Sequence, residues 1–301
     1  MTTNPYPVSQ SNRNLTILAW VTTILISTLP DIIFDQLAGG IPGWLLYSKM
    51  GLMLVLSLAA FILKSLRPLR NYFIVMFAFF GLFEVFARVN FTLPFLQRLF
   101  GHNVFDVRMQ AEQTGKLAVS LVMILILLVL GYKRQEFFLS RGDLRAPIVP
   151  VRLLGFPKRE PWTSFGLLWG FAIAATLAIV MYLGARPGSS VLLKIVPILP
   201  SILFYAALNA FNEEMTYRAP MIATLEPVGG STQVLWMSAY FFGIAHYFGT
   251  PGGILGGLLS IFMGWILGKA MVETRGLFWA WWIHFLSDVA IFFFLTVALL
   301  S

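Results

Sequence analysis

The sequence contains no cysteine, and it is poor in charged residues. Without cysteine, the chain can form no disulfide, no thiolate metal site and no cysteine nucleophile. Only 11% of its 301 residues are Asp, Glu, Lys or Arg, whereas a soluble domain carries about a quarter. So few charges cannot cover a water-facing surface, which excludes a soluble enzyme. With 58% hydrophobic residues and a mean hydropathy of +0.80, we expect an integral membrane protein.

Several signatures of hydrolytic sites are also absent. The chain has no His-Glu-x-x-His motif of a zinc metalloprotease, no Gly-x-Gly-Asp motif of an intramembrane aspartyl protease and no Gly-x-Ser-x-Gly nucleophile turn. Its net charge of +8 is typical of cytoplasmic loops that face anionic lipid, so we expect no nucleic-acid partner.

Long apolar runs dominate what is present. A helix crosses the bilayer with about 20 apolar residues, and about nine runs approach that length. We therefore predict an all-α, polytopic helical bundle with about eight or nine transmembrane helices. The runs cover residues 15–34, 46–63, 72–91, 117–132, 164–183, 191–211, 233–248, 254–272 and 277–300.

The distribution of Lys and Arg predicts the orientation. These residues concentrate in residues 64–71 and 133–163, while few lie in the loops predicted on the other side, which are residues 35–44, 92–116, 184–190 and 249–253. The positive-inside rule then places the basic loops and the N-terminus in the cytoplasm. We expect the plasma membrane of a prokaryote.

Residues 133–163 form a basic segment that contains several prolines, and it is the one domain boundary that the sequence suggests. We divide the chain there into an N-terminal four-helix region, residues 1–160, and a second membrane domain, residues 161–301. The second region holds nearly all the unusual polar residues, so we expect the chemistry to lie there.

Two adjacent carboxylates interrupt an apolar run. Each charge at membrane depth costs about 2.5 to 3.5 kcal/mol on insertion scales, so a structural or chemical role must offset that cost. Glu214 and Arg218 are four residues apart, the spacing of a helical ion pair. Glu213 points about 100° away around the helix, and only Tyr217 follows it at that spacing. Either Glu213 is free for chemistry, or both acids neutralise Arg218.

The chain has three histidines, two of them inside apolar runs. Asp288 follows His284 by one helical turn, so its carboxyl group can orient that imidazole or share a ligand with it. Counting along the predicted helices places Glu213, His246 and His284 at similar depths near the middle of the membrane. We interpret His102, in a predicted loop, as an ordinary solvated side chain.

Two further patterns are interpreted as structural. Small residues repeat every fourth position between the two intramembrane histidines and should draw the helices with His246 and His284 together. Glu84 and Arg88 have the spacing of an internal ion pair. The small residues are Gly252, Gly256, Ser260, Gly264 and Gly268.

Three motifs stand in order on successive predicted helices. They are Glu213-Glu214-x-x-x-Arg218, Phe242-x-x-x-His246 and His284-x-x-x-Asp288. Together they resemble the motifs of the CAAX prenyl endopeptidase and bacteriocin-processing family of intramembrane proteases, also called the Abi family. The resemblance covers residues 198–289.

The resemblance implies a role for each motif residue. Glu213 would be the base that activates water, His246 its partner on that water, and His284 with Asp288 would face the oxyanion. Asp288 departs from well-characterised relatives, which have Asn there. An ionised Asp cannot donate a hydrogen bond, so Asp288 is protonated, orients His284 or helps to bind a metal. Supporting roles fall to Glu214, Arg218, Phe242 and Tyr217.

The cofactor stays open between two alternatives. Members that resemble this chain are often labelled metalloproteases, and zinc would have Glu213, His246, His284 and Asp288 as its candidate ligands. We favour the metal-free mechanism that depends on Glu213.

The resemblance implies an intramembrane endopeptidase acting near the cytoplasmic side of the membrane. Its substrate would be a peptide, a lipidated protein or the terminus of a membrane protein. The alternative is a non-proteolytic immunity or scaffold protein of the same family. A proton-coupled transporter would use some of the same residues, but no inverted repeat supports it.

Overall fold

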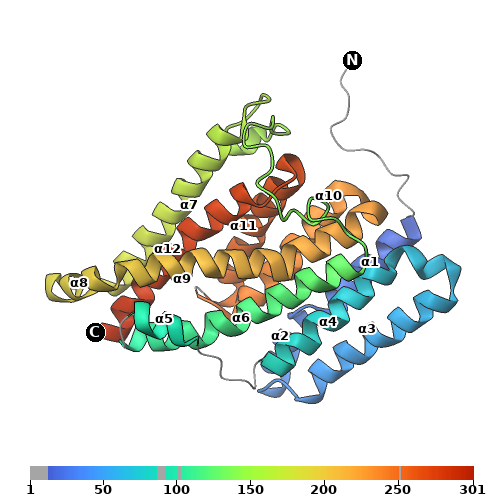
Figure 1. Cartoon of the computed structure of the whole chain (residues 1–301), viewed down its shortest axis with the longest axis horizontal. Helices are drawn as coiled ribbons and strands as arrows, with labels where there is room; N and C mark the ends of the chain where they lie inside the picture. Colours follow the sequence, from blue (N-terminus) through green and yellow to red (C-terminus); the bar gives the residue numbers. More distant parts are fainter. Residues whose placement is uncertain (1–12, 87–92, 101–102, 251) are drawn as a thin grey trace.

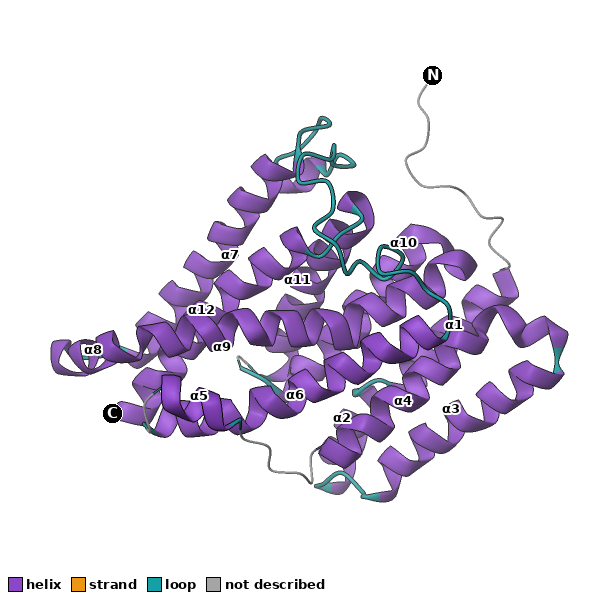
Figure 2. Cartoon of the chain, viewed as in Figure 1, coloured by secondary structure: helices purple, strands orange, loops and turns teal. Residues whose placement is uncertain are grey.

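The computed structural model describes residues 13–86, 93–100, 103–250 and 252–301. Helices joined by loops make up this part of the chain (Figures 1 and 2), which confirms the predicted all-α bundle. His102 and Arg88 lie outside the described residues, so the interpretations made for them stay predictions.

The described residues form twelve α-helices and five short helical turns. The α-helices are α1 (Arg13–Ile26), α2 (Leu29–Ala38), α3 (Trp44–Ile62), α4 (Arg70–Phe86), α5 (Pro94–Leu99), α6 (Val104–Val129), α7 (Trp162–Ala185), α8 (Ser189–Ile195), α9 (Leu199–Glu213), α10 (Ala219–Ala245), α11 (Gly253–Thr274) and α12 (Phe278–Leu300). The turns are η1 (Lys64–Leu69), η2 (Arg152–Leu154), η3 (Val196–Ile198), the π-helical η4 (Glu214–Arg218) and η5 (His246–Phe248).

Seven helical segments of the described chain are long and apolar enough to cross a membrane, or eight if α1 and α2, bent by 41°, form one broken span. One segment, Ser189–Phe248, has 60 residues. An unbroken helix of that length would measure about 90 Å, three times the thickness of the hydrocarbon core. The backbone departs from helical geometry at Gly230, where φ is 73° and ψ is 165°. The predicted runs 191–211 and 233–248 are the two arms on either side of this break.

Helix α6 corrects one predicted loop. Residues 104–116 were expected outside the membrane, but they form the first half of α6. Asn103 caps this helix, because its side chain accepts a hydrogen bond of 2.9 Å from the backbone N–H of Asp106. Polar residues that lower the hydropathy here, among them Gln113, are buried against other helices. Lys116 therefore lies within a membrane helix.

The basic loops lie together at one end of the bundle. Asn71 donates a hydrogen bond of 3.2 Å to the hydroxyl of Tyr132, and the N–H of Leu277 donates one of 2.8 Å to the carbonyl of Ser140. We call this the basic end; it comprises residues 63–70, 130–161 and 275–277. The opposite end carries residues 39–43, 186–188 and 249–250 and the C-terminus (Figure 1). Which end faces the cytoplasm stays a prediction.

Small residues bring α11 close to α10. A Cβ atom at Gly264 would lie 3.2 Å from the Cα of Ala239, and one at Gly268 would lie 3.1 Å from a methyl group of Leu235. Two residues of the predicted small-residue stripe, Gly264 and Gly268, thus face α10, the helix that ends just before His246. The closest approach is at Gly243 on α10, which packs directly against the backbone of Ile261.

Candidate active site

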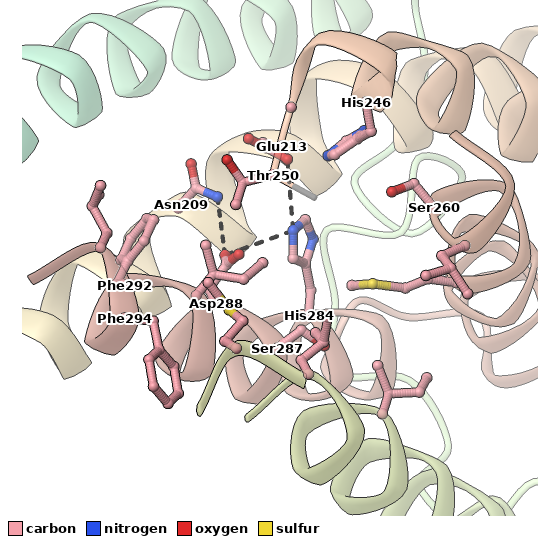
Figure 3. A pocket seen from close by; sticks show the side chains of 18 of the residues that line it. Asn209, Glu213, His246, Thr250, Ser260, His284, Ser287, Asp288, Phe292 and Phe294 are labelled. Atoms are coloured by element: carbon pink, nitrogen blue, oxygen red, sulfur yellow. Dashed lines mark hydrogen bonds and ion pairs between the residues drawn. The ribbon is translucent and has the colours of Figure 1, made fainter. Parts of the chain in front are cut away.

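Six helices enclose a cavity of about 760 Å³. They are α6, α7, α9, α10, α11 and α12. Four residues singled out in the sequence line this cavity, namely Glu213, His246, His284 and Asp288 (Figure 3). Phe242 also lines it. The structure therefore brings together side chains that are up to 75 positions apart in the sequence.

Glu213 ends α9, immediately before the π-helical turn. Its Oε1 accepts a hydrogen bond of 3.0 Å from the ammonium group of Lys116 on α6. Its Oε2 lies 3.6 Å from Nε2 of His284, which is too long for a hydrogen bond but within ion-pair range. The side chain is 13% exposed, so one carboxylate oxygen is held by a cation and the other faces His284.

The next residue, Glu214, is fully buried and has a different environment. One of its oxygens contacts both the guanidinium group of Arg218 and, at 2.9 Å, Nδ1 of His284. Arg218 is also fully buried, and its guanidinium carbon lies 4.5 Å from the centre of the Phe242 ring, a cation–π distance. The predicted pairing of Glu214 with Arg218 is confirmed. Glu214 of this buried pair also holds His284 through the hydrogen bond with Nδ1.

His246 and His284 are held in different ways. Nδ1 of His246 lies 3.0 Å from the backbone carbonyl of Phe242. A carbonyl oxygen only accepts, so Nδ1 carries the proton of this hydrogen bond and Nε2 is left for other partners. Nδ1 of His284 donates to the Glu214 carboxylate, so its Nε2 is the nitrogen that faces Glu213 and Asp288.

Asp288 is connected to Glu213 through Asn209 and Lys116. The amide nitrogen of Asn209 donates to Asp288 Oδ2 at 2.9 Å, and its oxygen accepts from Lys116 at 2.9 Å and from Gln113 at 2.8 Å. The amide orientation follows from this network, because an ammonium group can only donate. Asp288 Oδ2 also lies 3.6 Å from His284 Nε2, as the spacing of these two residues predicted.

Sequence reasoning missed Lys116 and Asn209. Lys116 was assigned to a loop because the polar first half of α6 was not recognised as helix. The available signal was its place four residues after Glu112, with which it forms an ion pair of 3.0 Å. Asn209 lies four residues before Glu213, one helical turn away. Like the two carboxylates, an asparagine inside an apolar run indicates a candidate site residue.

Tyr217 packs among aromatic side chains. Its ring packs against Phe79, at a centroid distance of 5.1 Å, and against Phe83, at 5.7 Å. It lines a second cavity, of about 290 Å³, and is not among the residues that line the larger one. Tyr217 therefore belongs to the aromatic packing of the bundle.

The arrangement of the candidate zinc ligands shows whether they could bind the metal together. A catalytic zinc ion takes three protein ligands at about 2.0 to 2.2 Å. Among residues 13–86, 93–100, 103–250 and 252–301, no three His, Asp or Glu side chains are grouped so that they could hold a metal ion. Lys116 already occupies Glu213 Oε1. As arranged, these side chains do not fit zinc.

Comparison with known proteins identifies one family. The family model described as type II CAAX prenyl endopeptidase Rce1-like matches residues 195–290. This segment contains the three motifs but not Lys116, which lies on α6. No curated protein and no solved structure matches the chain. The resemblance seen in the motifs is confirmed: residues 195–290 are similar to the Rce1-like family of type II CAAX prenyl endopeptidases.

Proposed function

We propose that this protein is an intramembrane endopeptidase in which Glu213 activates the water that hydrolyses a peptide bond. One observation carries the proposal. Glu213 has one oxygen bound to Lys116, while the other faces His284 in a cavity that His246 and Asp288 also line. Burying so many charged groups in a bilayer costs several kcal/mol, which a chemical role would justify.

The proposed reaction uses the chain's own groups. Glu213 removes a proton from water as the water oxygen bonds to the carbonyl carbon of the substrate. His246 orients this water through its Nε2 atom, and His284, when protonated at Nε2, donates to the developing oxyanion. As the carbon–nitrogen bond breaks, Glu213 returns the proton to the leaving nitrogen. The products are a peptide with a new carboxylate and a peptide with a new amine.

The cavity wall favours an apolar substrate segment. Its apolar lining includes Phe292, Phe294 and Leu295 of α12 and Leu177 and Met181 of α7. Such a wall would accept aliphatic or aromatic side chains, or an attached lipid chain. We propose a peptide or the terminus of a membrane protein, lipidated or not, as the substrate.

The test is a cleavage assay with purified protein in proteoliposomes and a membrane peptide library. Wild type is compared with Glu213→Ala and His246→Ala, and with Glu226→Ala as a control, because Glu226 pairs with Arg275 outside the cavity. Loss of a general base lowers the rate by about 10² to 10⁴, so products should disappear in both cavity variants and persist in the control.

The same cleavage assay with a chelator tests separately whether zinc is required. If cleavage survives prolonged treatment with a strong chelator, Glu213 acts without a metal. If cleavage is lost and zinc restores it, the metal mechanism replaces the one above. If wild type yields no product and the two cavity variants keep the full cellular phenotype, the protein is a membrane immunity or scaffold protein instead.

A further inference from the structure

The large cavity is displaced toward one end of the bundle. On α12 it is lined from His284 to Ala298. Ala298 lies about 3 Å along the axis from the last residue of α12, whereas His284 lies about 9 Å from the first. The end that the cavity approaches is the C-terminal end of α12, opposite the basic end.

The neighbouring helices show the same displacement. On α6 the cavity begins at Arg108, about 6 Å from the start of the helix, and ends at Lys116, about 20 Å from its last residue. On α11 its last lining residue, Met263, is still about 17 Å from the basic end of that helix. Gly249 and Thr250, in the connection between α10 and α11 at the opposite end, also line the cavity.

The basic end is closed by tight packing of α7 and α12. A Cβ atom at Gly166 would collide with the indole ring of Trp279, so these helices are in direct contact there. The indole N–H of Trp279 on α12 donates a hydrogen bond of 3.1 Å to the carbonyl of Leu144 in the basic segment. The indole N–H of Trp162 on α7 donates one of 2.9 Å to Glu273 on α11. The first bond fixes the basic segment to α12, and the second joins α7 to α11.

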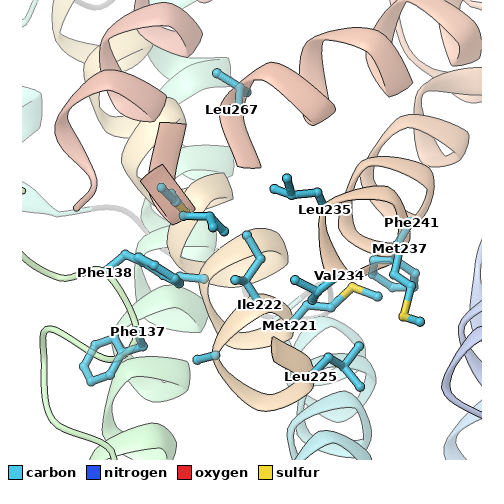
Figure 4. Packing of buried hydrophobic residues seen from close by; sticks show 14 of the residues in the cluster. Phe137, Phe138, Met221, Ile222, Leu225, Val234, Leu235, Met237, Phe241 and Leu267 are labelled. Carbon is cyan, nitrogen blue, oxygen red and sulfur yellow. The ribbon is translucent and has the colours of Figure 1, made fainter. Parts of the chain in front are cut away.

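A buried apolar cluster completes this closure. Phe137 and Phe138 of the basic segment are fully buried in the same cluster as Met221, Ile222 and Leu225 of α10 (Figure 4). Apolar side chains packed this closely leave no room for water between them. At the opposite end, the lining includes the exposed polar side chains of Arg108, Glu112 and Thr250.

We infer that water and substrate reach Glu213 from the end opposite the basic loops, which the positive-inside rule makes the extracytoplasmic side. The inference rests on the proposed function for the identity of the ligand. It replaces the cytoplasmic access that the family resemblance suggested. The substrate is then a peptide segment exposed outside the cytoplasm, such as a translocated peptide or the extracytoplasmic terminus of a membrane protein.

The test uses single cysteines, because the natural chain has none. Ser260→Cys places a thiol in the cavity wall. Leu153→Cys marks the basic end, where Leu153 is 94% exposed, and Ser189→Cys marks the opposite end at the start of α8. Each variant is treated with a membrane-impermeant charged maleimide in intact cells and in inverted membrane vesicles.

The expected result is labelling of Ser260→Cys and Ser189→Cys in intact cells, and of Leu153→Cys in inverted vesicles only. Labelling of Ser260→Cys in inverted vesicles alone would overturn the inference. So would labelling of Ser260→Cys only after denaturation, because the cavity would then be closed at both ends. Neither result depends on catalysis, whereas a failed cleavage assay with the expected labelling pattern counts against the proposed function alone.

Discussion

The ammonium group of Lys116 lies 3.0 Å from one oxygen of Glu213 and 2.9 Å from the side-chain oxygen of Asn209. Lys116 comes from α6, outside the segment that matches the Rce1-like family. It links Glu213 to Asp288, because Asn209 also donates to Asp288. The first region of the chain thus contributes a charged group to the candidate site.

Lys116→Met should lower cleavage by about tenfold to a hundredfold, a loss of about 1.4 to 2.7 kcal/mol in transition-state stabilisation. The reason is that Glu213 loses the cation that fixes and balances its carboxylate. Lys116→Arg keeps a cation and should recover part of the rate. The readout is kcat/KM together with the melting temperature in detergent. Equal loss in both variants with unchanged melting would show that the amine itself is needed.

Arg218→Met should destabilise the protein by about 3 to 5 kcal/mol, because removing one partner leaves the Glu214 charge buried and unpaired. Arg275→Met is the matched control. Arg275 pairs with Glu226 but is 47% exposed, so its loss should cost about 1 kcal/mol or less. Thermal unfolding in detergent measures both, and similar melting temperatures for the two variants would contradict this account.

Asp288→Asn should keep cleavage within about tenfold of wild type, because an amide oxygen can still accept from Asn209. Asp288→Ala removes that acceptor and should lower the rate further. Comparing the two variants shows whether Asp288 acts as a hydrogen-bond acceptor or through its negative charge. If Asn is as inactive as Ala, the negative charge at this position is required, and the metal-ligand or His284-orienting role gains support.

Gly243→Ala should destabilise the bundle, because the new methyl group would collide with the backbone of Ile261 and push α10 away from α11. Gly257→Ala is the control on α11, since its Cβ would lie at an ordinary 3.8 Å from the carbonyl oxygen of Gly243. We expect lower melting temperature and lower cleavage for the first variant only. Unchanged melting of Gly243→Ala would mean that the two helices separate without cost.

Local spacing predicted the parts of the site that lie along single helices. The pairing of Glu214 with Arg218 and the approach of Asp288 to His284 both follow from a four-residue separation, which places side chains on one face of a helix. Spacing did not predict the surroundings of Tyr217. Its ring packs against Phe79 of α4, a contact between two helices that spacing along one helix does not contain.

The sequence by itself determined the membrane class, the order of the apolar helices and the four polar residues that belong together. Hydropathy and residue type are enough for these, because lipid tolerates a buried charge only where another group offsets its cost. Tertiary structure decided that Lys116 reaches Glu213 and that the cavity lies toward the end opposite the basic loops. Both depend on how helices distant in the sequence rotate and pack against one another, and no local pattern contains that information.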